Sequence, residues 1–175
     1  MKVLIVSDIH GHYFNMKKVL DDNPSFDYLF LLGDVLNGPS YMQGYDPEEL
    51  TLLLNKISRK IFYVQGNCDR YSMEELDCFD ERDFLTIPVD KKYFFITHGH
   101  RYSRNYLPDE LPFDVFIQGH THIPMMERVR DKIFLNPGSI SLPRGGSDAS
   151  YIFYEDGVFT LKSVEKNRII KKIEL

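Results

Sequence analysis

The chain has 175 residues, 43% of them hydrophobic and 27% charged, which favours one ordinary globular domain spanning residues 1–175. A chain of this length buries roughly 70% of its unfolded surface, so it can fold without disulfides. Its formal net charge of −5 creates no global positive field, which argues against broad binding to nucleic acid or to anionic membranes. A phosphate substrate is not excluded, because bound divalent cations would dominate the local potential.

The cysteine content and the start of the chain indicate a compartment. Cys68 and Cys78 are the only cysteines, too few for a disulfide framework, so we expect a reducing, cytoplasmic setting. The apolar run in the opening MKVLIVSD is too short for a signal peptide. No stretch approaches the ~20 apolar residues that span a bilayer.

The first part of the chain alternates predicted strands and helices. Three short apolar runs are predicted as buried strands: Lys2–Val6, Tyr28–Leu32 and Lys60–Gln65. A helix is predicted over Tyr13–Leu20, where apolar residues have helical spacing, and a loop over Asn37–Gly44. Asp46 as N-cap and Pro47 at the first helical position predict a second helix that ends near Ile57. This alternation predicts a mostly parallel sheet with helices on its faces.

The rest of the chain is predicted to consist of strands with few helices between them. The predicted strands are Phe84–Val89, Tyr93–Thr97, Val115–Gln118, Met126–Arg130, Lys132–Leu135, Tyr151–Tyr154, Val158–Val164 and Arg168–Ile173. Asp156-Gly157 is a strong hairpin signal, and Asp131 is a weaker one. No internal repeat, low-complexity segment or linker divides the sequence. It therefore predicts two packed sheets with helices outside, in one α/β unit.

The six histidines form three His-x-His pairs: His10/His12, His98/His100 and His120/His122. Scattered core histidines would not pair three times. Each pair follows an apolar predicted strand, and so do the dipeptides Gly33-Asp34 and Gly66-Asn67. Because the carboxyl ends of strands form the ligand crevice of open α/β sheets, we expect these groups to lie close together.

Taken one at a time, these signals have simpler explanations. Asp8 could cap a helix or form an Asx-turn, and Gly33-Asp34 and Gly66-Asn67 are more often turns. Paired imidazoles, as in Gly119-His120-Thr121-His122, are uncommon at a strand end without a metal. The decisive feature is that the signals recur at the same end of five strands. Imidazole suits borderline transition metals and carboxylate suits hard ones, so a set too large for one ion predicts a two-metal site that hydrolyses a phosphate ester.

The motifs resemble those of a known family. They are Ser7-Asp8-Ile9-His10-Gly11, Gly33-Asp34-Val35-Leu36-Asn37, Gly66-Asn67-Cys68-Asp69, Thr97-His98-Gly99-His100, Gly119-His120-Thr121-His122 and Asn136-Pro137-Gly138-Ser139. Together they resemble the calcineurin-like metallophosphoesterase superfamily, most of all its small YfcE-type microbial phosphodiesterases. The resemblance covers nearly the whole chain. It implies a four-layer αββα sandwich, in which two packed mixed sheets are flanked by helices.

The resemblance also implies two divalent metal ions. One would be held by Asp8, His10, Asp34 and His122, and the other by Asp34, Asn67, His98 and His120, with Asp34 as the bridge. Mn²⁺ is the expected metal, with Fe, Ni, Co and Zn left open. A hydroxide shared by the two metals would attack the phosphorus of a small-molecule phosphodiester. The implied catalytic residues are Asp34, Asn67, His98 and Asp69.

One position departs from many relatives, which carry His where this chain has Cys68. A thiol has a reference pKa of about 8.5 and cannot act as an imidazolium, so help for the leaving group must come from elsewhere. This favours a phosphodiesterase over a strong monoesterase. The neighbouring Asp69 is expected to orient a ligand imidazole, although an exposed turn carboxylate is nearly as good an interpretation.

Substrate contacts are predicted from position in the chain. The candidates are Asn37, Cys68, Arg70, Arg101 and Arg144, although such arginines are often solvated surface. His12 and His100 are expected to line the cleft or to cap a turn. Asn136-Pro137-Gly138-Ser139 is expected to form a rigid turn beneath the site.

Two other functions stay open at this point. A non-catalytic protein-interaction scaffold on the same fold, such as the retromer scaffold subunit, lacks a competent set of ligands, whereas the set in this sequence is complete. A nuclease of the same superfamily would need a basic groove or an accessory domain, and the sequence shows neither. The late apolar strands could bury a homo-oligomer interface, and no membrane partner is expected.

Overall fold

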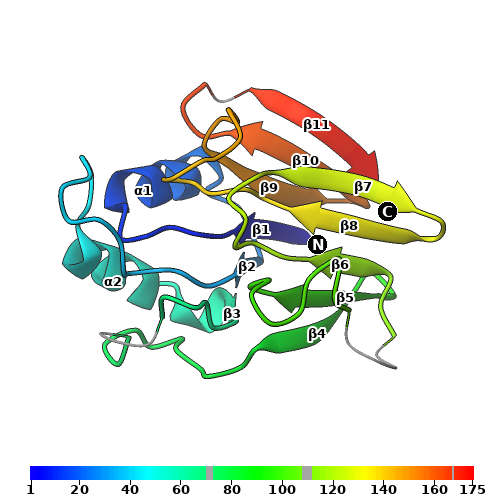
Figure 1. The fold of residues 1–175 in the computed structure, drawn as a ribbon, viewed down its shortest axis with the longest axis horizontal. Coiled ribbons are helices and arrows are strands. Elements are labelled where there is room, and N and C mark those ends of the chain that lie inside the picture. Colours follow the sequence, from blue (N-terminus) through cyan, green and yellow to red (C-terminus); the bar gives the residue numbers. More distant parts are fainter. Residues whose placement is uncertain (70–72, 108–111, 167) are drawn as a thin grey trace.

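The computed structural model describes residues 1–69, 73–107, 112–166 and 168–175 and contains two mixed β-sheets packed face to face (Figure 1). The strands of the first sheet lie in the order β11 (Ile169–Glu174), β10 (Val158–Ser163), β9 (Ser150–Glu155), β1 (Lys2–Val6), β2 (Tyr28–Leu31) and β3 (Ile61–Tyr63). The strands of the second sheet lie in the order β4 (Phe84–Val89), β5 (Lys92–Thr97), β6 (Val115–Ile117), β8 (Lys132–Asn136) and β7 (Met125–Val129).

The parallel strands of both sheets contribute their carboxyl ends to one polar edge. Strands β1, β2 and β3 are parallel in the first sheet, and β5, β6 and β8 are parallel in the second. The segments that follow them are joined by backbone hydrogen bonds, from Asp8 N–H to Gly33 O at 3.2 Å and from Gly119 N–H to His98 O at 2.8 Å. The His120 N–H then crosses between the sheets to Asp8 Oδ2 at 3.0 Å.

The core between the sheets follows from alternation along each strand. In β1, Val3 and Ile5 face the second sheet, whereas Leu4 and Val6 face the helices. All four side chains are fully buried, and each such burial contributes about 1.5–3 kcal/mol. Because both faces of β1 are covered, its sequence is a continuous apolar run and not an alternating one.

Helices α1 (Tyr13–Asp22) and α2 (Pro47–Asn55) cover the outer face of the first sheet (Figure 1). Asp46 caps α2 as predicted, because its Oδ1 accepts the Glu49 N–H at 3.0 Å. Among the described residues, no helix is both long enough and apolar enough to cross a membrane.

Aromatic side chains cover the outer face of the second sheet. Phe95, Phe116 and Phe134 form a buried cluster there with Phe113, and Tyr102 packs edge-on against Phe95. The predicted sandwich of two mixed sheets is confirmed. In the described part of the chain, however, both α-helices lie on the first sheet, and the loop residues Tyr102 and Phe113 pack on the outer face of the second sheet.

Most predicted elements are confirmed to within one or two residues. The predicted third strand is shorter than expected at both ends: Lys60 belongs to the 3₁₀ turn η1 (Ser58–Lys60), and β3 ends at Tyr63. The second helix ends at Asn55 and not at Ile57. Asp156-Gly157 connects β9 to β10 as predicted, and the Asp131 signal falls in the turn between β7 and β8.

Candidate metal centre

The backbone of the polar edge is strained. Five predicted metal ligands have a positive φ: Asp8 (54°), His10 (49°), Asp34 (53°), His120 (66°) and His122 (60°). The left-handed region costs an L-residue roughly 1–2 kcal/mol. Strain of this kind persists only where the surrounding structure enforces it, and it concentrates at functional sites.

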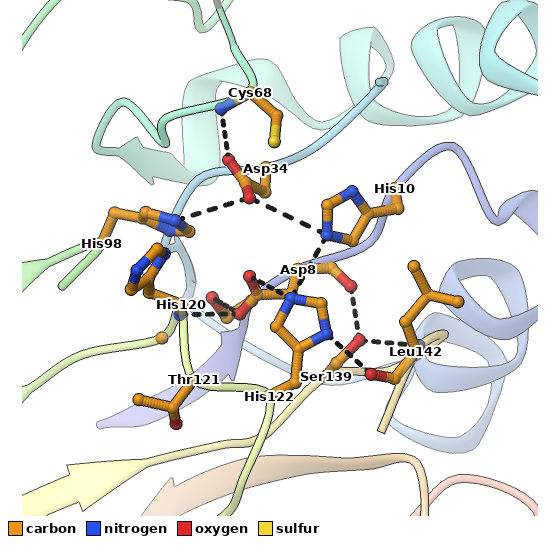
Figure 2. A network of polar contacts seen from close by, with 12 residues as sticks. Asp8, His10, Asp34, Cys68, His98, His120, Thr121, His122, Ser139 and Leu142 are labelled. Carbon is orange, nitrogen blue, oxygen red and sulfur yellow. Dashed lines mark hydrogen bonds and ion pairs between the residues drawn. The ribbon is translucent and has the colours of Figure 1, made fainter. Parts of the chain in front are cut away.

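One group of ligand atoms gathers around Asp8, His10 and His122. The His122 Nε2 atom lies 3.2 Å from Asp8 Oδ1 and 3.4 Å from His10 Nε2. The ligand atoms of these three buried residues all lie within 4.8 Å of one another, which is the spacing of a set that could share one cation. Figure 2 shows the two imidazoles and the carboxylate facing a common centre.

A second group gathers around Asp34 and His98. The His98 Nε2 atom lies 3.5 Å from Asp34 Oδ2 and 3.1 Å from Asn67 Oδ1. The same Asp34 Oδ2 atom lies 3.8 Å from His10 Nε2, which belongs to the first group. Asp34 therefore stands between the two groups, with His98 and His10 on opposite sides of its carboxylate (Figure 2).

Backbone carbonyls determine which nitrogen of each imidazole is free. Nδ1 of His10 contacts Asn37 O at 2.7 Å, Nδ1 of His98 contacts Leu32 O at 2.6 Å, and Nδ1 of His122 contacts Leu142 O at 2.6 Å. Because a carbonyl can only accept, each Nδ1 must carry the hydrogen. The Nε2 lone pair of each neutral ring then faces a carboxylate oxygen or another ring.

The Nε2 lone pairs and the carboxylate oxygens that they face repel one another unless a positive charge lies between them. Asp8 Oδ1 is buried and accepts no hydrogen bond from any described residue. Burial opposes protonation of His98 and His122, but Asp34 and Asp8 raise the pKa of these two rings overall. A divalent cation satisfies the same atoms without protonating them. The residues present therefore fit divalent metal ions.

Comparison with known proteins identifies the family. Residues 1–156 match the calcineurin-like phosphoesterase superfamily domain. The chain is 34% identical over 185 aligned residues to phosphodiesterase YfcE of Escherichia coli strain K12, covering 100% of this chain and 98% of that protein. The chain belongs to the calcineurin-like phosphoesterase superfamily.

Further sequence relatives and solved structures match most of this chain. The solved structure of the E. coli phosphoesterase YfcE superposes with a TM-score of 0.90 and covers 99% of each chain. Phosphodiesterase MJ0936 of Methanocaldococcus jannaschii is 30% identical over 148 residues, 79% of this chain and 83% of that protein. Vps29 of Entamoeba histolytica superposes with a TM-score of 0.67 at 20% identity over 100% of this chain and 99% of that one, which shows a shared fold alone.

Asp69 anchors the backbone around the predicted ligands Asp34 and Asn67. It is fully buried, and its carboxylate accepts the N–H groups of Asp34 (2.6 Å), Val35 (2.9 Å) and Gly66 (2.9 Å) and the Tyr63 hydroxyl (2.9 Å). The expectation that Asp69 orients an imidazole, or lies in an exposed turn, is therefore wrong. Its oxygens hold the backbone on either side of the ligand segments, and the sequence offered no signal for its partner Tyr63.

Close packing at the site requires glycine at two positions. A Cβ at Gly66 would lie 2.2 Å from Asp34 Oδ1, and a Cβ at Gly119 would lie 1.8 Å from Ser7 Oγ. The Ser7 hydroxyl in turn donates to Asp8 Oδ2 at 2.6 Å, a contact that sequence reasoning missed. Glycine at these positions lets the ligand segments approach one another directly.

The Asn-Pro-Gly-Ser segment forms the turn beneath the site that the sequence predicted. Ser139 Oγ donates to Asp8 O at 2.7 Å and accepts the Leu142 N–H at 2.8 Å. Leu142 O is the acceptor that orients His122 (Figure 2). Asn136 Nδ2 donates to Gly119 O at 2.8 Å. The turn therefore supports Asp8 and His122 together.

The ligand atoms face a cavity of about 590 Å³. Its lining residues are His10, Asp34, Asn37, Gly38, Pro39, Asn67, Cys68, His120, Thr121, His122, Leu142 and Arg144. The structure thus places three predicted substrate contacts, Asn37, Cys68 and Arg144, in the wall of the cavity. Arg101 is not among the lining residues, and its guanidinium pairs with Asp83 Oδ2 at 2.8 Å. Arg70 lies outside the described residues.

The other histidines singled out in the sequence, and Cys68, lie in different surroundings. His12 caps α1, since its Nδ1 accepts the Asn15 N–H at 3.2 Å. The ring of His120 lies 5.1 Å from that of His98, centroid to centroid. His100 has a buried Nδ1 without a hydrogen-bond partner among the described residues, and burial lowers the pKa of its ring to about 4. Burial, with the nearby Asp34 carboxylate, raises the pKa of the Cys68 thiol to about 12.

Proposed function

We propose that this protein is a phosphodiesterase that hydrolyses small-molecule phosphodiesters with two bound divalent cations. The observation that carries the proposal is the orientation of His10, His98 and His122. Backbone carbonyls turn the Nε2 atoms of these rings toward two buried carboxylates, so the fold maintains a site that only positive charge can satisfy. The phosphodiesterases among its relatives support the same activity.

The proposed ligand sets share Asp34. Asp8, His10, Asp34 and His122 would hold one cation, and Asp34, Asn67, His98 and His120 would hold the other. When bound, such a pair activates a water molecule as the nucleophile and neutralises charge on the phosphate. Mn²⁺ is the proposed metal, although these nitrogen and oxygen ligands also suit Fe, Ni, Co and Zn.

Neighbouring residues hold the proposed ligands in position. Asp69 keeps the Asp34 and Gly66 backbone in place, and the Cys68 N–H holds Asp34 Oδ1 at 2.8 Å. Asn37 joins two walls of the cavity, since its carbonyl orients His10 and its side-chain amide donates to Cys68 O at 2.5 Å. Cys68 cannot replace an imidazolium, because a thiol carries no positive charge, and burial beside Asp34 raises the pKa of its thiol in the metal-free protein.

Hydrolysis of bis(p-nitrophenyl) phosphate by metal-free and Mn²⁺-loaded protein tests the proposal. We expect turnover only in the loaded protein. Asp34→Asn should lose Mn²⁺ affinity and at least about 1,000-fold in kcat/KM, because one change weakens both cation positions. Asp131→Asn, an exposed carboxylate in the turn between β7 and β8, should behave like the wild type. Full turnover by the metal-free protein or by Asp34→Asn would refute the proposal.

The same assay separates the alternative functions. A non-catalytic scaffold, which the fold shared with Vps29 allows, would show no Mn²⁺-dependent turnover of any phosphate ester. A nuclease would cleave oligonucleotides faster than small diesters. We further propose that residues 1–175 act as one domain in the cytoplasm, where the two unpaired cysteines would stay reduced. Sedimentation of the purified protein would decide whether the proposed homo-oligomer forms.

A further inference from the structure

The loop after the Asn-Pro-Gly-Ser turn contributes a positively charged residue, Arg144, to the cavity wall. Arg144 lines the cavity together with His10, His122 and Cys68. Its backbone N–H donates to His122 O at 3.1 Å, and its own carbonyl accepts the Ser147 N–H at 3.2 Å and the Ser147 hydroxyl at 2.8 Å. The backbone of Arg144 is therefore held against one of the predicted ligand segments.

The guanidinium of Arg144 differs from those of several other arginines in the described part of the chain, which are paired with carboxylates. Arg82, Arg101 and Arg168 each pair with an aspartate at 2.8–2.9 Å. No carboxylate of the described residues pairs with Arg144, and its side chain is exposed. Among the described residues that line the cavity, it is the only Lys or Arg. An unneutralised guanidinium at this place is free to take an anion from the cavity.

A phosphodiester has the chemistry that this guanidinium recognises. Its two non-bridging oxygens share one negative charge, and the planar fork of Arg can donate to both at once. Cys68 in the same wall offers no positive charge, because a thiol is neutral when protonated and anionic when it is not. The cavity thus has one fixed cationic side chain from its described wall, and that side chain is Arg144.

We propose that Arg144 is a catalytic residue that binds the non-bridging oxygens of the substrate phosphate. The proposal rests on the phosphodiesterase function and adds to it a specific substrate contact outside the metal ligands. The loop at residues 140–147 would then have two roles: it orients His122, and it binds the substrate through Arg144.

Kinetics of Mn²⁺-loaded full-length variants test the proposal. Arg144→Ala should lower kcat/KM for bis(p-nitrophenyl) phosphate by about 10- to 100-fold, the worth of a charge-assisted pair of hydrogen bonds. Arg144→Lys should recover part of the loss, since it keeps the charge without the fork. Millimolar guanidinium chloride should partly rescue Arg144→Ala. Arg101→Ala is the matched control and should keep wild-type activity with no response to guanidinium.

A binding measurement separates this proposal from the function on which it rests. Calorimetric titration of inorganic phosphate into the Mn²⁺-loaded protein should show an affinity about tenfold lower in Arg144→Ala than in the wild type. The Mn²⁺ affinity should stay within about twofold of the wild type. An inactive wild type would refute the phosphodiesterase proposal, while the phosphate titration would still test Arg144.

Two outcomes would overturn the role of Arg144. In the first, Arg144→Ala and Arg144→Lys keep wild-type kcat/KM and phosphate affinity. In the second, Mn²⁺ affinity falls in parallel with activity and guanidinium restores nothing, which would mean that Arg144 acts only by holding His122.

Discussion

The two ends of the sandwich use the same rare backbone conformation for different purposes. Nine non-glycine residues in the described ranges have a positive φ. Four lie in the tight turns of the β4–β5, β7–β8 and β9–β10 hairpins: Asp90, Lys91, Arg130 and Asp156. The other five are the predicted ligands Asp8, His10, Asp34, His120 and His122.

Turn geometry explains the positive φ values in the hairpins but not those at the polar edge. A two-residue hairpin turn requires positive φ, because this geometry matches the twist of the strands it joins. At the polar edge no hairpin requires it. There the left-handed residues carry the predicted ligand side chains, and surrounding hydrogen bonds hold their backbone in place.

Glycine substitutions at the two ends should give the largest contrast. Gly66→Ala places a Cβ 2.2 Å from Asp34 Oδ1, so we expect a loss of more than about 100-fold in kcat/KM and about 1–3 kcal/mol of unfolding free energy. Gly157→Ala meets no atom within 4 Å but must adopt a φ of +80°. It should lose about 1 kcal/mol and no activity. Urea unfolding and steady-state kinetics measure both, and equal activity losses would contradict the comparison.

Two carboxylates that accept hydrogen bonds from backbone N–H groups allow a second comparison of the polar edge with the hairpin end. Asp69→Asn leaves one acceptor oxygen for four donors around Asp34 and Gly66, so we expect Mn²⁺ affinity to fall about 10- to 100-fold and the unfolding free energy to fall by about 1.5–3 kcal/mol. Asp114 accepts the Tyr93 N–H at 2.8 Å far from the polar edge. Asp114→Asn should leave Mn²⁺ affinity unchanged in the same titration. A normal Mn²⁺ affinity in Asp69→Asn would show that Asp69 is merely structural.

The smallest expected effect concerns acid stability. Hydrogen bonds from Lys166 and Arg168 lower the pKa of Asp148 to about 2, below the value of about 3.9 for an unfolded Asp. A lowered folded-state pKa adds stability above the unfolded value, and this stability is lost as the pH falls through about 4 to about 2. Urea unfolding of the wild type and of Asp148→Asn should therefore differ at neutral pH and converge below that window. A difference that persists at the lowest pH would rule out this ion pair as the cause.

The positions of the strands along the chain could be predicted because hydrophobic patterns are local properties of the sequence. The order of the strands within each sheet was not predicted, because it depends on pairing between distant segments. Apolar runs such as Lys2–Val6 indicate buried strands, and the polar residues that follow them indicate the ligand edge. The alternation of the first part also predicted its two helices. Asp69 could not be interpreted correctly, because an acidic residue after Gly-Asn has the same local signature whether it faces a ring, the solvent or a set of backbone amides.

Position in the sequence likewise ranked Arg101 and Arg144 equally, since each follows a site motif. The structure separates them, because Asp83 lies beside Arg101 and pairs with it. The wall of the cavity around Arg144 contains no such partner among the described residues. Ion pairs of this kind join residues from different loops, and the spacing along the chain does not reveal them.

Hydrophobic runs and ligand residue types can be recognised one segment at a time, so the sequence alone was enough to predict an α/β fold and to propose which side chains bind metal. The folded structure was needed to show which nitrogen of His10, His98 and His122 is free, which oxygens that nitrogen faces, and which described arginine lines the cavity. These properties depend on backbone carbonyls and carboxylates from distant segments, which meet only when the two sheets pack.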